Sequence, residues 1–367
     1  MKFHCDKALL VKELTIAQEV VSNRSTISIL SNILITVENG KLTLRSTDTK
    51  TAFQSIIPVS VDVPGSITVN SDKFLGSLKN LPEGLVLLEL QSDGRFLIKP
   101  EKRNITYQLR TMSSENYPWV QWETEGIKFT IGQSELLDMI NQTIFAVSDD
   151  DSRFFMTGVY FDYQDNVLKL VATDGRRLSL ARHDIEINQP FNVIVPTKPL
   201  SIIKKLASGQ GTIDIIISEK SIVFILDNQR IFSNFIDGQF PNYQRVIPDS
   251  QLYSAKINRD DFVDAIRRVS LMADQKSQRI LLTLTNSNAI ISSEESELGM
   301  AKEEIPIEYN GPQSQIAMNY QYLLDPLRVY PDPDVFFLFS DTKRAVTLRP
   351  ISEKNFFHIV MPMQLAD

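Results

Sequence analysis

Hydrophobic and polar positions follow a helical period in three stretches that are evenly spaced along the chain. Apolar residues recur at steps of three and four in the ranges 7–21, 133–147 and 259–273, which predicts an amphipathic helix in each range. The starts of these helices are 126 residues apart in both steps. A short β-rich run precedes each helix, and Asp6 is a suitable N-cap for the first helix.

A second helical stretch follows in each third of the chain, at 71–80, 198–207 and 319–330. Between the helices lie short runs with strand character, separated by turn pairs such as Asn39-Gly40 and Asp93-Gly94. Each third therefore predicts two helices and about eight short strands, an α+β domain with its helices on one face of antiparallel sheets. Three tandem copies are expected, with limits at 1–124, 125–252 and 253–367.

Composition is that of a globular protein, with 43% hydrophobic and 23% charged residues. No apolar run is long enough to span a membrane, and the first residues do not have the pattern of a signal peptide. The single cysteine, Cys5, has no partner for an internal disulfide, which fits a reducing compartment. We therefore expect a cytoplasmic protein without a membrane segment.

The charge is unevenly divided, although the chain as a whole is acidic. Net charge is −7, yet the six predicted helices contain eleven Lys or Arg and only nine Asp or Glu. The helices thus carry +2 and the rest of the chain −9. This sign pattern is compatible with a nucleic-acid binder whose basic residues gather on its helices, but the difference is small.

Motifs typical of enzymes are absent from the sequence. There is no phosphate-binding loop, no dinucleotide fingerprint and no nucleophile elbow, and the three histidines lack metal-ligand spacing. Asp149–Asp151 is the acidic cluster most able to attract a cation, although a solvated turn explains it more simply. We expect no catalytic residue, no metal and no cofactor.

Two segments carry more features than packing alone requires. Residues 171–178 read Val-Ala-Thr-Asp-Gly-Arg-Arg-Leu, a tight Asp-Gly hairpin with two arginines at its exit, and the C-terminus from Val360 to Leu365 is apolar and rich in methionine. An ordinary hairpin and a tail tied to its own domain are the simpler readings of these segments.

Together with the threefold repeat and Phe240-Pro241-Asn242-Tyr243, these segments make the chain resemble the bacterial DNA polymerase III β subunit family, the sliding clamps. The resemblance extends over the whole chain. It implies a non-catalytic processivity factor that forms a head-to-tail homodimer, a ring of six domains around duplex DNA. It also implies that replicative polymerase, clamp loader, repair proteins and translesion polymerases bind through short peptides with a Gln and large apolar side chains.

The resemblance places the peptide-binding pocket between the second and third domains. Its deep apolar subsite would use Thr173, Gly175, Arg177, Leu178, Pro241, Val246, Val360 and Met361, bordered by Met156 and Arg245. A shallower subsite for the Gln would use Arg153, Arg176, Asn319, Tyr322, Met361, Pro362, Met363 and Gln364, with Leu365 at the end of the tail.

By the same resemblance, Arg24, Lys79 and Lys198 would contact DNA, and Leu109, Leu271 and Met272 would form the dimer interface. Two alternatives stay open on the sequence alone. One is an enzyme that uses Asp149–Asp151 and a cation for hydrolysis, and the other is a monomeric adaptor built from the same repeats without topological binding of DNA.

Overall fold

The computed structural model describes residues 1–21, 27–120, 122, 125–295, 297, 299–352 and 355–364. The chain forms two compact units. The N-terminal unit comprises Met1–Leu137, Ile187–Gln189 and Val195–Phe235, and the C-terminal unit comprises Asp138–Glu186, Pro190–Ile194 and Ile236–Asp367. Each unit is described by itself below.

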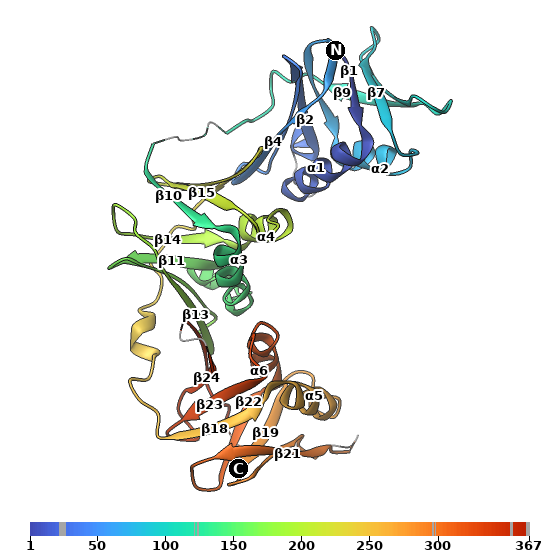
Figure 1. The fold of residues 1–367 in the computed structure, drawn as a ribbon. Helices are drawn as coiled ribbons and strands as arrows, with labels where there is room; N and C mark the ends of the chain where they lie inside the picture. Colours follow the sequence, from blue (N-terminus) through green and yellow to red (C-terminus); the bar gives the residue numbers. More distant parts are fainter. Residues whose placement is uncertain are drawn as a thin grey trace. The chain divides into compact units, whose positions relative to one another are not determined.

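The described elements repeat three times in the predicted order, as Figure 1 traces from blue to red. The first set is β1 (Lys2–Asp6), α1 (Lys7–Val20), η1 (Ser28–Ser31), β2 (Asn32–Glu38), β3 (Lys41–Thr47), β4 (Thr51–Pro58), β5 (Ser60–Val63), β6 (Gly65–Asn70), α2 (Ser71–Lys79), β7 (Leu85–Leu90), β8 (Arg95–Pro100) and β9 (Tyr107–Met112). The second set is β10 (Ile127–Gly132), α3 (Gln133–Asn141), η2 (Ile144–Ala146), η3 (Asp151–Met156), β11 (Gly158–Gln164), β12 (Val167–Thr173), β13 (Arg177–Asp184), β14 (Phe191–Pro196), α4 (Thr197–Leu206), β15 (Thr212–Ile217), β16 (Ser221–Leu226) and β17 (Gln229–Asn234). The third set is η4 (Tyr243–Val246), β18 (Tyr253–Asn258), α5 (Arg259–Ser270), β19 (Arg279–Leu284), β20 (Asn288–Ser292), β21 (Lys302–Tyr309), β22 (Ser314–Asn319), α6 (Tyr320–Leu327), β23 (Asp334–Phe339), β24 (Val346–Pro350) and β25 (Phe356–Val360).

All six helices start within one residue of the predicted position, but three of them end early. Asp6 caps α1, since its side chain accepts a hydrogen bond from the Leu9 amide at 3.0 Å. The prediction that α3, the first helix of the second repeat, continues to Val147 is wrong, because α3 ends at Asn141. There the Thr143 hydroxyl donates to the Met139 carbonyl at 2.7 Å, and a 3-10 turn follows. The predicted ends at Ala273 for α5 and Tyr330 for α6 are also too late.

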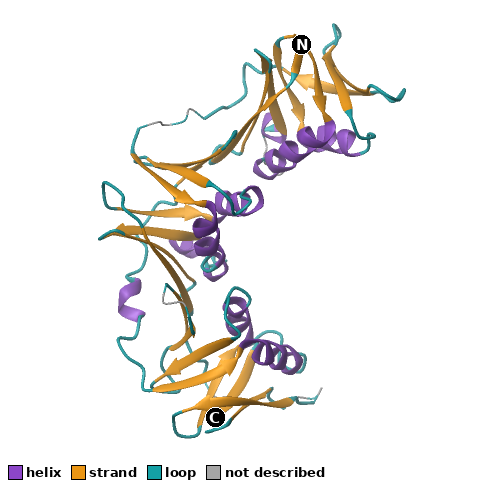
Figure 2. Ribbon diagram, in the orientation of Figure 1, coloured by secondary structure: helices purple, strands orange, loops and turns teal. Residues whose placement is uncertain are grey.

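Each unit is built on one continuous antiparallel sheet within the described residues. The N-terminal unit has a 13-stranded sheet in which β17 pairs with β4, and the C-terminal unit has a 12-stranded sheet in which β13 pairs with β25. Figure 2 shows the helices of each unit gathered on one side of its strands. The sheets thus continue from one repeat into the next, and the predicted domain limits remain a prediction.

The helices bury the apolar faces that their periodicity predicted. Leu10, Leu14 and Ala17 of α1 are fully buried, as are Phe262 and Ile266 of α5. Each such side chain contributes about 1.5–3 kcal/mol relative to an exposed position. Packing of these faces therefore holds the helices on the sheets.

Two charged residues of α1, Lys7 and Glu13, are buried as well. Both were counted in the helix charge of +2, so that sum does not measure the charge at the surface of the helices. Glu13 accepts hydrogen bonds from Gln229 at 2.8 and 3.0 Å, and Lys7 donates to the Leu81 carbonyl and to Glu83, both at 2.7 Å. Buried charges are kept only with such partners. These two residues therefore hold the N-terminal unit together and present no charge to a ligand.

Candidate functional site

The hairpin between β12 and β13 is held by its own side chains. Gly175 has φ +86°, a conformation that favours glycine, and the Asp174 carboxylate accepts hydrogen bonds from the amides of Arg176 (2.8 Å) and Arg177 (3.0 Å). The Thr173 hydroxyl accepts from the Gly175 amide and donates to the Arg177 carbonyl at 2.6 Å. The predicted Asp-Gly hairpin is confirmed, and its loop is rigid because side chains bond most of its backbone.

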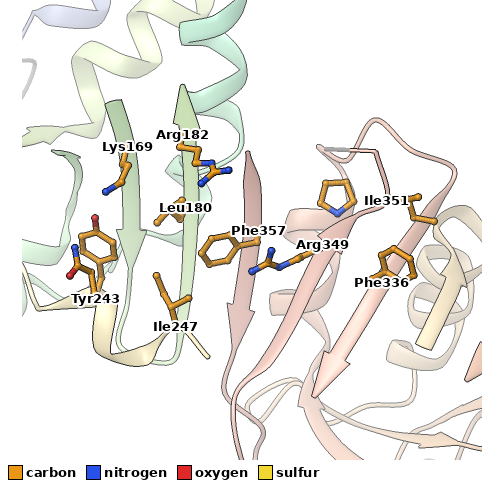
Figure 3. Close-up of a pocket in the computed structure, with 11 residues that line it drawn as sticks. Lys169, Leu180, Arg182, Tyr243, Ile247, Phe336, Arg349, Ile351 and Phe357 are labelled. Carbon is orange, nitrogen blue, oxygen red and sulfur yellow. The ribbon is translucent and has the colours of Figure 1, made fainter. Parts of the chain in front are cut away.

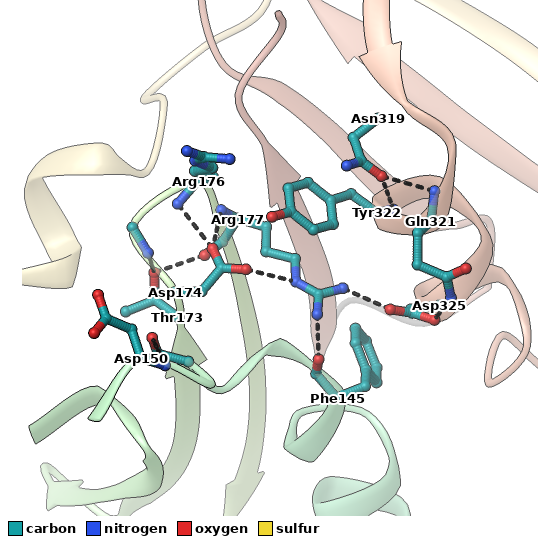
Figure 4. A network of polar contacts seen from close by, with 12 residues as sticks. Phe145, Asp150, Thr173, Asp174, Arg176, Arg177, Asn319, Gln321, Tyr322 and Asp325 are labelled. Atoms are coloured by element: carbon teal, nitrogen blue, oxygen red, sulfur yellow. Dashed lines mark hydrogen bonds and ion pairs between the residues drawn. The ribbon is translucent and has the colours of Figure 1, made fainter. Parts of the chain in front are cut away.

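Arg177 ties this hairpin to two other segments of the C-terminal unit (Figure 4). Its guanidinium donates to Asp174 at 3.1 Å, to Asp325 of α6 at 2.6 Å and to the Phe145 carbonyl at 2.5 Å. The ring of Tyr322 lies 4.5 Å from the guanidinium carbon. Burial raises the pKa of Tyr322, so this ring stays neutral and stacks on the cation.

A cavity of about 300 Å³ opens beside the hairpin, and its lining is mostly apolar. It is lined by Met156, Thr173, Gly175, Arg176, Arg177, Leu178, Pro241, Asn242, Tyr243, Val246, Ile359 and Met361. The tail closes one wall, where the Met361 amide donates to the Arg176 carbonyl at 2.9 Å. A partly open apolar cavity with a few polar groups at its edge suits one or two large side chains of a peptide.

Eight of the ten residues predicted for the deep subsite and its border line this cavity, as does Arg176 of the predicted Gln subsite, and Val360 and Arg245 do not. Val360 is fully buried in β25, and because side chains alternate along a strand, Ile359 faces the cavity instead. Arg245 lies exposed on η4. The sequence reasoning missed Ile359, Asn242 and Tyr243, although the last two belong to the Phe-Pro-Asn-Tyr motif and the first follows from β25 alternation.

A second, shallower hollow of about 530 Å³ contains Arg153, Arg176 and Tyr322 of the predicted Gln subsite. Arg153 is fixed by Asp150 at 2.9 Å and by the Asp174 carbonyl at 2.9 Å. Gln278 and Gln321 also line this hollow and were not predicted. The hollow thus combines arginines, the carboxylates of Asp149, Asp150 and Asp174 and two amide side chains, and such donors and acceptors suit a polar side chain.

The remaining predicted subsite residues support this region and line neither hollow. Asn319 caps α6 through the amides of Gln321 and Tyr322, the Met363 amide donates to the Ala317 carbonyl at 2.8 Å, and the Gln364 carbonyl accepts from Arg279 at 2.9 Å. Pro362 lies half-buried between them. Leu365 lies outside the described residues. These contacts hold the tail against β22.

The predicted DNA contacts differ in their surroundings. Lys79 is exposed in the last turn of α2, whereas Lys198 donates to Asp48 at 2.5 Å and to the Val20 carbonyl at 2.9 Å. The charge of Lys198 is therefore largely balanced within the N-terminal unit. Arg24 lies outside the described residues.

The predicted interface residues are apolar side chains at the surface of their own units. Leu109 is half-buried on β9, and Leu271 and Met272, just after α5, are 80% and 42% exposed. Large apolar side chains exposed next to each other are typical of surfaces that bind a partner.

The Asp149–Asp151 cluster has a structural role in the turn before η3. Asp150 is the N-cap of η3, and hydrogen bonds from Ser152 and Arg153 hold the pKa of its carboxyl below the ordinary value. Among the described residues, no group of three or more His, Cys, Asp or Glu could hold a metal ion. In the part of the chain that the structure describes, no helix is long and apolar enough to span a membrane.

Comparison with known proteins identifies relatives along the whole chain. Models of the N-terminal, central and C-terminal domains of the DNA polymerase III beta subunit match residues 1–121, 130–242 and 244–364. The beta sliding clamp of Treponema pallidum is 40% identical and covers 99% of this chain and 100% of its own, and that of Pseudomonas aeruginosa is 30% identical with full coverage of both chains.

Solved structures agree with this assignment. The DNA polymerase sliding clamp of Bacillus subtilis is 28% identical with a TM-score of 0.94, and a P. aeruginosa sliding clamp bound to griselimycin is 29% identical with a TM-score of 0.94. Both cover 100% of this chain and 100% of their own. The chain therefore belongs to the DNA polymerase III β subunit family, the β sliding clamps.

Proposed function

We propose that this protein is a non-catalytic processivity factor of DNA polymerase, a ring that encircles duplex DNA and slides along it. The single observation that carries this proposal is the way the repeats join. Strand β17 of the second repeat pairs with β4 of the first, and β25 of the third pairs with β13 of the second. In repeat order, β9 is the equivalent of β17 and β25, while β21 is the equivalent of β4 and β13. These two strands lack such a junction among the described residues.

The register of the missing junction follows from the two that exist. The repeats can be aligned by starting at the residue before each first helix and following the paired residues from strand to strand. This alignment makes Gln108 on β9 equivalent to Phe232 on β17 and Ile359 on β25. The other edge is aligned in the same way, by starting at the two-residue turns after β2, β11 and β19 and following the paired residues across the next two strands. This alignment makes Met300, just before β21, equivalent to Ala52 and Leu178. Phe232 pairs with Ala52, and Ile359 pairs with Leu178. Gln108 of one copy should therefore pair with Met300 of another.

A junction of this kind is head-to-tail, and two copies close into a ring with two-fold symmetry. Leu109 lies next to Gln108 on β9, and Leu271 and Met272 follow α5, which packs on β21. These three apolar residues are the proposed interface contacts beside the strands. We propose the domain limits 1–124, 125–252 and 253–367. The family ranges 1–121 and 130–242 support the first boundary, and the start of β18 at Tyr253 supports the second, although the C-terminal family range begins at residue 244.

Disulfide trapping tests the ring and its register together. In Gln108→Cys/Met300→Cys, oxidation should give covalent dimers, because directly opposite residues have the Cα separation that a disulfide needs. The native Cys5 is 2% exposed and burial raises the pKa of its thiol to about 12, so it stays unreactive. The control Gln108→Cys/Lys302→Cys is two residues out of register and should not cross-link. Equal trapping in both variants, or in neither, would reject this junction.

Topological binding is the test of function. After loading by a clamp loader at moderate salt, the protein should stay on nicked circular duplex and be lost when the circle is cut open. Equal retention on circular and linear DNA would favour the monomeric adaptor instead. The net charge of −7 suits a sliding ring, since few fixed phosphate contacts must be broken at each step. We propose Arg24, Lys79 and Lys198 as the residues nearest to DNA.

We propose further that the 300 Å³ cavity and the shallower hollow receive short peptides of polymerase, clamp loader, repair proteins and translesion polymerases. Large apolar side chains would enter the cavity, and a Gln would bind beside Arg153, Arg176 and Tyr322. The bound griselimycin of the P. aeruginosa relative shows that a clamp of this family accepts a ligand. Such a protein acts on DNA, and we propose the cytoplasm as its place.

A further inference from the structure

A third hollow, of about 510 Å³ and distinct from the cavity and the Gln hollow described above, lies on the same face of the C-terminal sheet as the peptide cavity. Along β13, Leu178 lines the peptide cavity, and Leu180 and Arg182 line the third hollow. Residues two apart on a strand face the same side. Tyr243 lines both hollows, so they adjoin on the two sides of η4.

The third hollow has an apolar floor and basic side chains around it (Figure 3). Leu180 pairs with Phe357 in the floor, and both are buried. Lys169 pairs with Arg182 on one side of these residues, and Arg349 of β24 lies on the other side. Three cations from three strands thus surround a hydrophobic patch, and we call this site the basic hollow.

Among the described residues, no side chain forms an ion pair with any of the three cations of the basic hollow. Ion pairs of described residues elsewhere on this sheet, such as Lys256 with Asp334, involve none of the three. Arg182 donates to the amide oxygen of Asn355 at 3.2 Å, a neutral partner. Asp162 lies opposite Lys169 on β11, and its carboxylate accepts the Tyr243 hydroxyl at 2.6 Å. The hollow therefore keeps a positive potential.

Arg349 adds a specific need for an acceptor. Its guanidinium carbon lies 4.8 Å from the centre of the Phe357 ring, which holds the side chain over the floor. Its Nε is buried and has no hydrogen-bond partner among the described residues. A buried donor without an acceptor is costly. Arg349 as a whole is half-buried and lines the hollow, so a carboxylate there would meet its guanidinium in a charge-assisted contact.

We propose that the basic hollow binds an acidic segment of the same partner polypeptide whose Gln and apolar motif occupies the peptide cavity. Carboxylates would meet Lys169, Arg182 and Arg349, and an apolar side chain would rest on Leu180 and Phe357. This inference rests on the proposed function of the cavity. DNA is the less suitable occupant. The residues that we propose to lie nearest to DNA, Lys79 and Lys198, stand on helices, whereas the basic hollow faces away from α6, the helix that contacts β25 on the opposite side of the sheet.

Tethering explains why such a segment would matter. Once the motif is bound, the acidic segment binds from the same molecule at a high effective concentration, so weak contacts add to the affinity of the whole peptide. Charges at a partly exposed site are screened by salt. We expect an acidic extension to raise the affinity of a motif peptide about 10-fold at low salt and less at high salt.

The experiment measures the affinity of the full-length protein for a set of synthetic peptides by fluorescence anisotropy. The motif alone is compared with two extended designs, in which a Gly-Ser linker joins it to an Asp/Glu/Phe segment or to the same segment with Asn/Gln in place of the acids. Each extended design is made in two forms, with the extension before or after the motif, so that five peptides are measured in all. The acidic extension should raise the affinity about 10-fold at one end, and the neutral extension should raise it less than about 2-fold.

Variants then locate the gain. In Lys169→Glu/Arg182→Glu the gain from the acidic extension should disappear, while the motif peptide keeps its affinity, which also reports that the cavity is folded. Lys50→Glu/Lys220→Glu, at two exposed lysines of the N-terminal unit, changes the net charge by the same amount and is the matched control, which should keep the gain. An equal gain in the double variant, or no gain in the unaltered protein, overturns the inference. Failure of the motif peptide itself rejects the proposed function of the cavity and this inference with it.

Discussion

Arg177 is the residue whose replacement should most clearly reveal what stabilises the peptide cavity. The side chains of Arg177, Asp174 and Asp325 are only 10%, 14% and 12% exposed, and the guanidinium bonds both carboxylates. Arg177→Met keeps much of the volume but leaves two nearly buried carboxylates without this cation. It also leaves the Phe145 carbonyl without this donor.

The magnitude follows from the cost of orphaned charges. Removing one partner of a buried ion pair costs about 3–5 kcal/mol. Asp325 retains a hydrogen bond from Gln321 at 2.5 Å and Arg328 at 3.5 Å, so we expect the lower end of this range, about 3 kcal/mol. Arg177→Met/Asp325→Leu removes one of the orphaned charges and should recover at least about 1 kcal/mol.

Native-state hydrogen exchange measures this cost where it arises. The amides of β13 and α6 should exchange about 100-fold faster in Arg177→Met, which corresponds to about 3 kcal/mol of local stability. Amides of the N-terminal sheet should be unchanged and serve as the internal control. If β13 and α6 exchange at the rate of the unaltered protein, the network does not stabilise the site, and the reasoning from burial and charge is refuted.

Three further expectations follow from other parts of the structure. Burial lowers the pKa of His358 to about 3 from an ordinary 6.5, so the folded protein keeps it neutral while the unfolded chain takes up a proton as pH falls. The free energy of unfolding should therefore decline below pH 6.5, by about 2 kcal/mol at pH 5. Urea unfolding of His358→Phe should lack this pH-dependent loss. An equal pH dependence in both proteins would show that His358 is not its source. Leu271→Asp places a charge on an 80% exposed apolar residue and should yield monomers in sedimentation, whereas Leu252→Asp, 69% exposed, should not. Removal of residues 361–367 should abolish binding of a motif peptide and leave the dimer intact, and a monomeric truncated protein would show that cavity and interface are not separate.

The sequence allowed the repeats to be predicted because their signals are local. Helix starts follow from caps such as Asp6 and Asn258 and from the spacing of apolar residues, and these signals act within a single turn. The end of α3 depends on the Thr143 hydroxyl, which donates a hydrogen bond to the Met139 carbonyl. This bond forms only in the backbone conformation that the folded chain gives Thr143. For this reason the starts were predicted better than the ends.

The candidate site was predicted in part, for the same physical reason. The Asp174-Gly175 turn is encoded by neighbours in sequence, and the tail resembled that of the family. The role of Arg177 as the centre of a polar network depends on Asp325, 148 residues away, and the lining by Ile359 depends on the register of β25 with β13. Contacts over such separations follow from tertiary packing, which periodicity does not encode.

The two junctions within the chain explain why a cavity lies at one of them. Ala52 and Phe232, at the first junction, are equivalent to Leu178 and Ile359, which line the cavity at the second. At the first junction Trp119 and Trp122 pack on Ala52 and Phe232, and the rings of Trp122 and Phe232 are 5.8 Å apart.

A linker between consecutive repeats packs on each junction, and the two linkers differ in what they place on the sheet. The first brings two tryptophans onto it. The second packs Phe240 and Tyr243 against Leu178 and Ile359, but beside them Pro241, Asn242 and Val246 leave about 300 Å³ open. Packed interiors leave few voids of this size unless something fills them. The peptide cavity is therefore the space that an intramolecular tryptophan fills in the first repeat, and a large apolar side chain from a partner should fill it in the second.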